Sequence, residues 1–327
     1  MDVNVFRHRK AIRRLTRITW SYWCKKQVEV SYFPYRLWIE PTNRCNLACT
    51  MCPNKDFKKE ELGFMDMDLF RNIIDQAQGK VHDVNLHHRG EPTLHPNLVE
   101  MIQYANSKGI KTKLHTNGTT LTENLAKELV QSGLRLISFS FDGYVANVYE
   151  KIRVRANFQR TLNNIHRFLE LKKEYNAEDL KTVMEVIEFG EGSYSETDKE
   201  QFISSIKDRG LNRLIIKQPH NWAGNVELKT GETEKFSPCT FPWHALVILW
   251  DGRVGSCPHD FFAQIIYGDV KQNSLREIFN SEKIQSLRGQ MLMGQFSAVE
   301  SPCRECDSVR RHRIMGIPVA SLKYLRN

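Results

Sequence analysis

The chain has 327 residues, of which 41% are hydrophobic and 26% charged, a composition typical of a globular protein. This length allows a full hydrophobic core and excludes a bare one-helix or one-sheet module. No stretch approaches the roughly 20 apolar residues that cross a bilayer, and no secretory signal follows the N-terminal charges, so we expect a cytoplasmic protein.

The net charge of +9 is concentrated at the two ends of the chain. Residues 1–36 carry a net charge of +7 and the basic tail, residues 308–327, carries +5, whereas the segment between them carries −3. Residues 1–35 mix apolar and basic side chains, as in a basic amphipathic helix. The simplest interpretation is a helix that packs on the rest of the protein. Peripheral membrane contact is an alternative, and nucleic-acid binding has only the charge in its support.

Short β-rich runs alternate with helical patterns from about residue 36 to 220, which is typical of repeated βα units and a parallel sheet. The predicted strands cover 37–40, 83–87, 111–116, 135–141, 181–187 and 213–217. The predicted helices cover about 66–78, 96–108, 122–132, 158–175 and 198–208. Six such units predict an α/β fold, a partial TIM-like (β/α)6 barrel over residues 36–224.

The pattern changes after Gly224 to short segments punctuated by Gly and Pro, which indicates a small second domain over residues 225–307. Within it, residues 246–250 and 253–256 flank Asp251-Gly252, a pair typical of a two-residue hairpin turn. A helix is predicted at about 274–288.

Eight cysteines without any sign of secretion favour metal or redox chemistry over disulfides. Cys45, Cys49 and Cys52 follow the first predicted strand with the spacing Cys-x3-Cys-x2-Cys. Three thiolates from one loop suit three corners of a cubane 4Fe-4S cluster, and the fourth iron is then left open for a small chelating molecule. A zinc loop is the alternative, but zinc sites usually recruit a fourth ligand at finger-like spacing.

Polar and glycine residues also follow the next three predicted strands. They are Gly90, Glu91 and Pro92 after the second strand, Thr116 and Asn117 at the third, and Ser140 and Asp142 at the fourth. Because the carboxyl ends of parallel strands meet at one edge of a sheet, we expect these residues to lie beside the cysteine loop.

The segment Cys-Asn-Leu-Ala-Cys-Thr-Met-Cys at 45–52, after Trp-Ile-Glu-Pro-Thr-Asn-Arg at 38–44, resembles the radical S-adenosylmethionine (radical SAM) superfamily. The resemblance implies a 4Fe-4S cluster whose open iron chelates the amino and carboxylate groups of S-adenosylmethionine. It also implies that reductive cleavage of this cofactor yields a 5′-deoxyadenosyl radical, which abstracts hydrogen from an otherwise unreactive carbon.

The segment His88-Arg89-Gly90-Glu91-Pro92 is similar to the family's Gly-Gly-Glu-Pro element, with Arg89 where the first glycine usually stands. The resemblance places Gly90, Glu91 and Pro92 beside the methionine amino group. A glycine allows close backbone approach, and Glu91 offers a carboxylate to an ammonium group.

Further cofactor contacts follow from the same resemblance. It implies that Asn117, Ser140 and Asp142 stand at strand ends that contact the ribose and the carboxylate of the cofactor. Asp142 is also a candidate for capping a loop. Arg153 either holds the methionine carboxylate or pairs with a structural acid.

The remaining grouped cysteines are Cys239, Cys257, Cys303 and Cys306, whose spacing alone fits zinc as well as iron. Cys239-x12-Gly252-x4-Cys257 and Cys303-x2-Cys306 resemble the SPASM auxiliary-cluster domain. Because no cysteine follows Cys306, the resemblance implies a shortened domain of the SPASM or twitch type with one fully ligated auxiliary 4Fe-4S cluster.

Cys24 is the eighth cysteine, and we expect a small buried hydrophobe or, in an epimerase, a thiol that donates hydrogen to a substrate radical. Three histidines, His87, His88 and His95, are expected in the core, in polar networks or at the substrate. His220, Trp222 and His259 are further candidates for substrate contacts.

The leading functional hypothesis is a radical SAM oxidoreductase that dehydrogenates a small or carbohydrate-like substrate through its auxiliary cluster. We expect an external electron donor such as flavodoxin or ferredoxin. The alternatives are a radical SAM epimerase, a maturase that modifies a peptide or protein, and a non-enzymatic zinc-binding basic adaptor. A small substrate is favoured because 36 residues before the barrel leave no room for a peptide-recognition domain.

Overall fold

The computed structural model describes residues 20, 25–190, 194–221, 223, 239–294, 302–309, 313–314 and 317–318. Internal contacts divide the chain into two units. Trp38–Pro219 and Ile248–Gly252 form what we call the barrel unit, and the other described residues form the auxiliary unit. The domain limits predicted at residues 35, 224 and 307 stay predictions.

The barrel unit is built on strands in the order β6-β5-β4-β3-β2-β1. Their bounds are β1 (Arg36–Ile39), β2 (Asp83–Leu86), β3 (Lys111–Thr116), β4 (Leu136–Ser140), β5 (Lys181–Ile187) and β6 (Arg213–Lys217). The pairs from β2–β3 to β5–β6 are all parallel, and Ser140 of β4 lies opposite Glu185 of β5. The predicted strands and their parallel pairing are therefore confirmed, each strand within one residue of its expected bounds.

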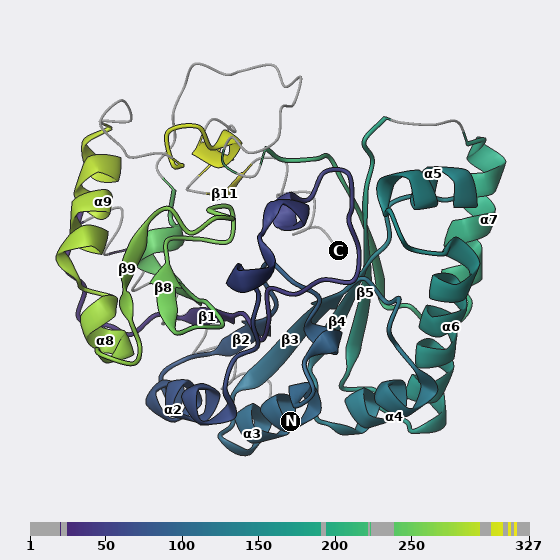
Figure 1. Ribbon diagram of the computed structural model, residues 1–327, viewed down its shortest axis with the longest axis horizontal. Coiled ribbons are helices and arrows are strands. Elements are labelled where there is room, and N and C mark those ends of the chain that lie inside the picture. Colours follow the sequence, from purple (N-terminus) through teal and green to yellow (C-terminus); the bar gives the residue numbers. More distant parts are fainter. Residues whose placement is uncertain are drawn as a thin grey trace. The chain divides into compact units, whose positions relative to one another are not determined.

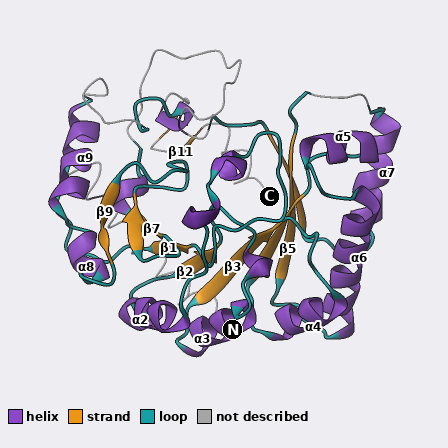
Figure 2. Cartoon of the chain, in the orientation of Figure 1, coloured by secondary structure: helices purple, strands orange, loops and turns teal. Residues whose placement is uncertain are grey.

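Helices alternate with these strands along the chain (Figure 2). They are α2 (Met67–Ala77), α3 (Leu98–Ser107), α4 (Glu123–Gln131), α5 (Ala146–Ile152), α6 (Phe158–Glu174) and α7 (Glu196–Lys207). Figure 1 shows α2, α3, α4 and α6 along one side of the strands. In α6, Leu162, Ile165 and Phe168 are buried at three-residue spacing, and the Phe168 ring meets Phe139 of β4 edge-on at 5.4 Å between centroids.

Local signals explain where these helices begin and end. The side chains of Asp66, Thr122 and Ser195 accept hydrogen bonds from the first backbone N–H groups of α2, α4 and α7. Gly133 follows α4 with φ +83°, a conformation that favours glycine, and a Cβ there would meet the Asn106 side chain. The short helix α5 was not predicted, because its seven residues are too few to show a clear helical period.

Strand β3 shows how one face of the sheet becomes polar. Thr112, Leu114 and Thr116 are buried, whereas the alternate residues Lys113 and His115 keep part of their surface exposed. Because successive side chains of a strand point to opposite faces, Lys113 and His115 share the other face of the sheet. Polar side chains therefore lie on one face of the sheet as well as at the ends of its strands.

The auxiliary unit contains short strands, and the predicted hairpin turn lies within Ile248–Gly252, which belongs to the barrel unit. The strands are β7 (Ala245–Ile248), β8 (Arg253–Gly255) and β9 (Ile266–Asp269), in the order β7-β8-β9, and β8 pairs with β9 antiparallel. The turn between β7 and β8 holds the predicted Asp251-Gly252, with φ +97° at Gly252. It is longer than the predicted two-residue turn, because β7 ends at Ile248 and the Gly252 amide donates to the Leu249 carbonyl. Strand β9 was not predicted. Two short strands, β10 (Arg313–Ile314) and β11 (Ile317–Pro318), pair with each other antiparallel.

The single helix predicted at 274–288 is wrong, because the segment forms two helices. They are α8 (Leu275–Ile278) and α9 (Glu282–Met293). Ser274 caps α8 through a capping box with Glu277, and Ser281 is the N-cap residue of α9. Both helices bury apolar residues, and Asn280 between them exchanges hydrogen bonds of 2.9 Å with the backbone of Val30. Tertiary contact decides this break, and the helical period of the sequence does not show it.

Arg288 ties several segments of the auxiliary unit together. Its guanidinium is fully buried and donates hydrogen bonds to the carbonyl oxygens of Val28, Pro242 and Phe279 at 2.7 to 3.1 Å. It also lies over the Phe279 ring, 4.6 Å from the centroid. Burial lowers the pKa of Arg288 to about 10, so the group stays charged at neutral pH.

Among the described residues, no helix combines the length and the hydropathy that crossing a membrane requires. Most of the basic amphipathic segment 1–35 and most of the tail 308–327 lie outside the described residues, so the prediction of membrane contact stays a prediction.

The substitution Arg288→Met should lower the free energy of unfolding by about 3 kcal/mol, because buried carbonyl oxygens lose their donors while the side-chain length is kept. Urea unfolding followed by circular dichroism measures this change. Arg276→Met, at an exposed position of α8, is the matched control and should change stability by less than about 0.5 kcal/mol. Equal effects of the two substitutions would contradict the role assigned to Arg288.

Candidate active site

Cys45, Cys49 and Cys52 lie on the loop between β1 and the 3-10 helix Pro53–Asp56, and all three are free thiols. Burial raises the pKa of Cys45 to about 12 and that of Cys52 to about 11, and the nearby Cys49 thiol raises the pKa of both further. Neighbouring buried thiols are difficult to ionise by themselves, and a bound metal cation offsets the free-energy cost of forming the thiolates. The donor set therefore fits three corners of a 4Fe-4S cluster.

The cysteine loop is held by backbone contacts with the last residue of α5 and with the segment that follows this helix. The amide of Ala48 donates to the carbonyl of Val154, and the amide of Thr50 donates to the carbonyl of Ile152. The loop therefore does not depend on a metal alone for its shape.

Gly90 marks the closest approach of the cysteine loop to the end of β2. A Cβ atom at this position would lie 2.4 Å from the carbonyl oxygen of Thr42 and 2.5 Å from that of Arg44. Such distances exclude any side chain, so the glycine of the predicted Gly-Glu-Pro segment is required by packing.

The carboxylate of Glu91 joins the ends of β2 and β3. It accepts hydrogen bonds from the Thr93 amide and hydroxyl, the Thr116 hydroxyl and the Asn117 amide, all within 3.1 Å. Burial raises the pKa of Glu91, and these donors act in the opposite direction. The contact of Glu91 with a methionine amino group stays a prediction, because four protein donors already use this carboxylate.

Asn117 reaches from the end of β3 to the cysteine loop. Its side-chain amide donates to Asn46 Oδ1 at 3.0 Å, and Asn46 in turn donates to the Thr119 hydroxyl at 2.7 Å. Thr119 closes the ring by donating to Asn117 Oδ1. Asn46 was not predicted as a site residue, although a polar residue between the motif cysteines is a signal.

Asp142 and Arg153 form a buried ion pair. Arg153 Nη2 and Nε lie 2.6 and 3.0 Å from Asp142 Oδ2, and Asp142 Oδ1 accepts the backbone N–H of Ile187. The structure shows Arg153 paired with an acid, and its predicted contact with the methionine carboxylate stays a prediction. Burial raises the pKa of Cys49 and the nearby Arg153 charge opposes it, so this ion pair stands close to the cysteine loop.

The described residues of the auxiliary unit bring the four remaining motif cysteines together. Cys239, Cys257, Cys303 and Cys306 are free thiols. Burial is the main cause that raises the pKa of Cys257 and Cys303. The thiols of Cys239 and Cys306 raise the pKa of both further, and Cys257 also raises that of Cys303. Four clustered thiols fit one fully ligated metal centre, and this donor set suits zinc as well as iron.

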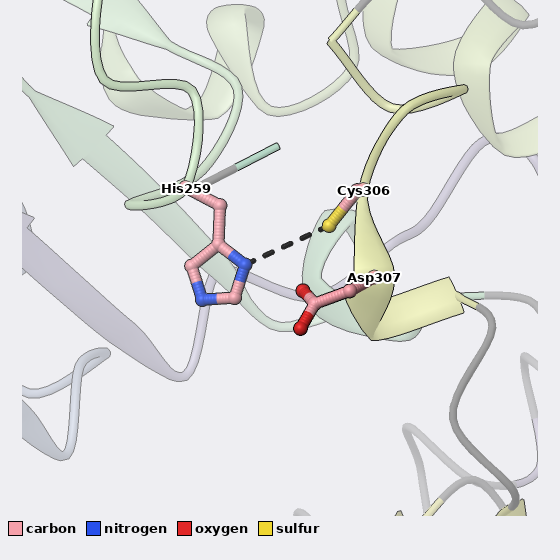
Figure 3. Close-up of side chains that lie close together, drawn as sticks. All are labelled: His259, Cys306 and Asp307. Carbon is pink, nitrogen blue, oxygen red and sulfur yellow. Dashed lines mark hydrogen bonds between the residues drawn. The ribbon is translucent and has the colours of Figure 1, made fainter. Parts of the chain in front are cut away.

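His259 lies against one of these cysteines (Figure 3). Its Nδ1 is 3.6 Å from Cys306 Sγ, and one ligand atom each of His259, Cys306 and Asp307 lies within 4.8 Å of the others. The ring of His220 stacks on that of His259 at 4.5 Å between centroids. Because Cys306 belongs to both groups, we interpret His259 and Asp307 as neighbours of the four-thiol centre.

The other candidates fall into two groups. His95 is part of the polar network of the barrel unit. Its Nε2 forms a hydrogen bond with the carbonyl oxygen of Met65, and its Nδ1 accepts one from the backbone amide of Asn97. His87 stacks on His115 at 4.0 Å, and burial lowers the pKa of both, that of His115 to about 4. Cys24 and Trp222 lie outside the described residues.

Comparisons with known proteins fit this geometry. A sequence profile of the radical SAM superfamily matches residues 39–184, and a profile of the SPASM iron-sulfur cluster-binding domain matches residues 239–307. A "tungsten-containing aldehyde ferredoxin oxidoreductase cofactor-modifying protein" of Pyrococcus furiosus is 28% identical over 76% of this chain and 81% of its own length. The mycofactocin maturase MftC of Mycobacterium tuberculosis is 32% identical, over 40% of this chain and 34% of its own.

Solved structures show the same fold. BtrN in complex with AdoMet and 2-DOIA aligns with a TM-score of 0.57 and 19% identity over 87% of this chain and 98% of that one. Streptococcus suis SuiB bound to the precursor peptide SuiA aligns with a TM-score of 0.57 and 15% identity over 86% of this chain and 76% of that one. The predicted α/β fold and the two predicted resemblances are thus confirmed. The chain carries a radical SAM domain over residues 39–184, which binds a 4Fe-4S cluster and S-adenosylmethionine, and a C-terminal SPASM domain for auxiliary iron–sulfur clusters over residues 239–307.

Proposed function

We propose that this enzyme dehydrogenates a small or carbohydrate-like substrate and passes one substrate electron to its auxiliary cluster. The proposal is supported by the proximity of four thiols, those of Cys239, Cys257, Cys303 and Cys306. Four thiolates saturate a cubane cluster, and a cluster without an open iron suits electron transfer better than chelation of a substrate.

The reaction balances as a two-electron oxidation. When bound, S-adenosylmethionine and the first cluster supply a 5′-deoxyadenosyl radical that takes one hydrogen atom from a substrate carbon. The substrate radical would then lose one proton to solvent and one electron to the auxiliary cluster that Cys239, Cys257, Cys303 and Cys306 would hold. An external donor such as flavodoxin or ferredoxin supplies the electron that starts each cycle.

The chain's own residues hold and orient the cofactor in this proposal. Cys45, Cys49 and Cys52 would hold three irons of the first cluster and leave the fourth open. The segment from Gly90 to Pro92 approaches the methionine amino group, with Glu91 fixing the strand ends that form the site. Asn117, Ser140 and Asp142 line the ribose and carboxylate side of the cofactor, and Arg153 fixes Asp142.

The proportion of each solved structure that aligns with this chain supports a small substrate. The alignment takes in 98% of the BtrN chain, whose crystal contains the small molecule 2-DOIA, against 76% of the SuiB chain, whose crystal contains a peptide. A second candidate, maturation of a cofactor, peptide or protein, is favoured by the likeness to the cofactor-modifying protein over 76% of this chain. Epimerisation is the third candidate and requires a hydrogen donor, for which Cys24 is proposed.

Turnover in deuterated water should leave no deuterium at the reacting carbon, because dehydrogenation removes hydrogen and does not return it. Mass spectrometry of the product and of 5′-deoxyadenosine measures the label. Deuterium at the reacting carbon would instead favour epimerisation, and Cys24→Ala would then abolish the label if this thiol is the donor.

Anaerobic reconstitution should load about eight irons per chain, and the double substitution Cys303→Ala/Cys306→Ala should leave about four. The cleavage of S-adenosylmethionine under chemical reduction should persist in this variant, because the first cluster keeps its ligands. Cys49→Ala is the matched variant and should abolish cleavage. About four irons together with one zinc in the unsubstituted protein would contradict the auxiliary 4Fe-4S cluster.

His259→Phe should make the midpoint potential of the auxiliary cluster more negative, because a ring N–H beside Cys306 Sγ stabilises the reduced, more negative cluster. Potentiometric titration followed by electron paramagnetic resonance (EPR) measures this potential. His244→Phe, at a histidine bonded to Thr240 O, is the control and should leave the potential unchanged. A potential unaltered by His259→Phe would remove His259 from the electron-transfer site.

A further inference from the structure

Arg89 stands where the family's Gly-Gly-Glu-Pro element has its first glycine, and the structure gives this arginine a defined set of contacts. Arg89 is 5% exposed. Its Nε lies 2.6 Å from Glu40 Oε2 and its Nη2 lies 2.7 Å from Glu40 Oε1. The Arg89 amide also donates to Glu40 Oε2, at 3.3 Å. Two parallel bonds between a guanidinium and a carboxylate form the most directional ion pair available to side chains.

Glu40 lies at the upstream flank of the cysteine loop. It follows the last residue of β1, is fully buried, and donates its own N–H to the carbonyl of Ile248 at 2.9 Å. The amide of Trp250 donates to Glu40 Oε1 at 3.3 Å. Burial alone would raise the pKa of Glu40, but the Arg89 guanidinium holds it below its ordinary value, so the pair stays ionised.

Arg89 also contacts the downstream flank of the same loop. The side-chain amide of Asn54 donates to the Arg89 carbonyl at 2.9 Å and to the Asn43 carbonyl at 2.8 Å. The guanidinium lies over the ring of Phe57, 5.2 Å from its centroid. Both Asn54 and Phe57 follow Cys52, the last thiol of the motif. One arginine therefore touches the chain before the three cysteines and the chain after them.

The residues next to Arg89 continue this attachment. The Glu91 amide donates to the Arg44 carbonyl at 2.8 Å, and Gly90 packs directly on the Thr42 and Arg44 carbonyls. In the site proposed above, S-adenosylmethionine would contact both the open iron of a cluster held by the cysteine loop and the segment from Gly90 to Pro92. Its affinity therefore depends on the separation of these two pieces, which the Arg89 contacts fix.

We propose that Arg89 is a positioning residue whose ion pair with Glu40 sets the cysteine loop against the Gly90–Pro92 segment and thereby sets the affinity for S-adenosylmethionine. A glycine at this position has no side chain with which to make these contacts. A buried ion pair often adds little to stability, so its effect is expected in the geometry of the site more than in the melting temperature.

The substitution Arg89→Lys tests this role in the reconstituted enzyme, because lysine keeps the charge and loses the fork of two bonds. We expect S-adenosylmethionine to bind about tenfold more weakly per loaded cluster, since small displacements of a positioned group are costly. Isothermal titration calorimetry measures the Kd. The EPR spectrum of the reduced first cluster should also change less when the cofactor is added.

Lys113→Met is the matched control. Lys113 of β3 forms an ion pair with Asp83 of β2 at 2.8 Å, so it also links two parts of the barrel unit. Asp83 is the first residue of β2, at the end of the strand away from the cysteine loop. The Lys113→Met variant should bind S-adenosylmethionine with the affinity of the unsubstituted enzyme. Equal losses of affinity in Lys113→Met and Arg89→Lys would overturn the proposal.

The double substitution Glu40→Met/Arg89→Met keeps the test decisive if Arg89→Lys fails to fold or to load its cluster. Removal of both charges avoids an unpaired buried charge, so the fold and the first cluster should be retained. Affinity for the cofactor should nevertheless fall to about the level expected of Arg89→Lys. Native affinity in the double variant, or a change confined to the melting temperature in either variant, would show that the pair is only structural.

Discussion

Parallel pairing of the strands from β2 to β6 is the constraint on which the barrel unit depends. Parallel strands all end at the same edge of the sheet, so each βα loop begins beside its neighbours. The residues that follow β2, β3 and β4 are far apart in sequence, yet Glu91 bonds Thr116 and Asn117 directly. Without this shared edge, the polar residues after each strand would not lie close together.

Buried charge at this edge is compensated residue by residue. Glu91 is surrounded by hydroxyl and amide donors, Glu40 is paired with Arg89, and Asp142 is paired with Arg153. Each carboxylate therefore meets the requirement that buried charged groups be bonded. The same contacts hold strand ends and loops at fixed separations, which a chelated cofactor requires on both of its sides.

The two cysteine groups differ in the number of donors, and this difference gives them different chemistry. Three thiols on one loop leave a coordination position open, whereas four thiols close the site. The open site suits a chelating cofactor, and the closed site suits an electron carrier. The position of His259 beside Cys306 adds a polar neighbour to the closed site, which is the kind of contact that tunes a metal centre.

Much of this architecture can be read from the sequence, because local signals carry it. The six strands of the barrel unit, its longer helices and the Asp251-Gly252 turn follow from hydrophobic period, caps and turn residues. The cysteine spacings likewise predict two metal centres, although the choice of iron for the second came from the resemblance to the SPASM domain and not from the spacing. Short or context-dependent elements were missed: helix α5, strand β9 and the break between α8 and α9 depend on what packs against them.

The contacts within the site could not be predicted in this way. The sequence by itself determined that three cysteines follow the first strand and that Arg89 replaces a glycine. Only the tertiary structure decided that Arg89 pairs with Glu40, 49 residues earlier, and that Arg153 pairs with Asp142. The physical reason is that an ion pair leaves no periodic trace in the chain. Its partners meet only after the sheet has aligned the strand ends.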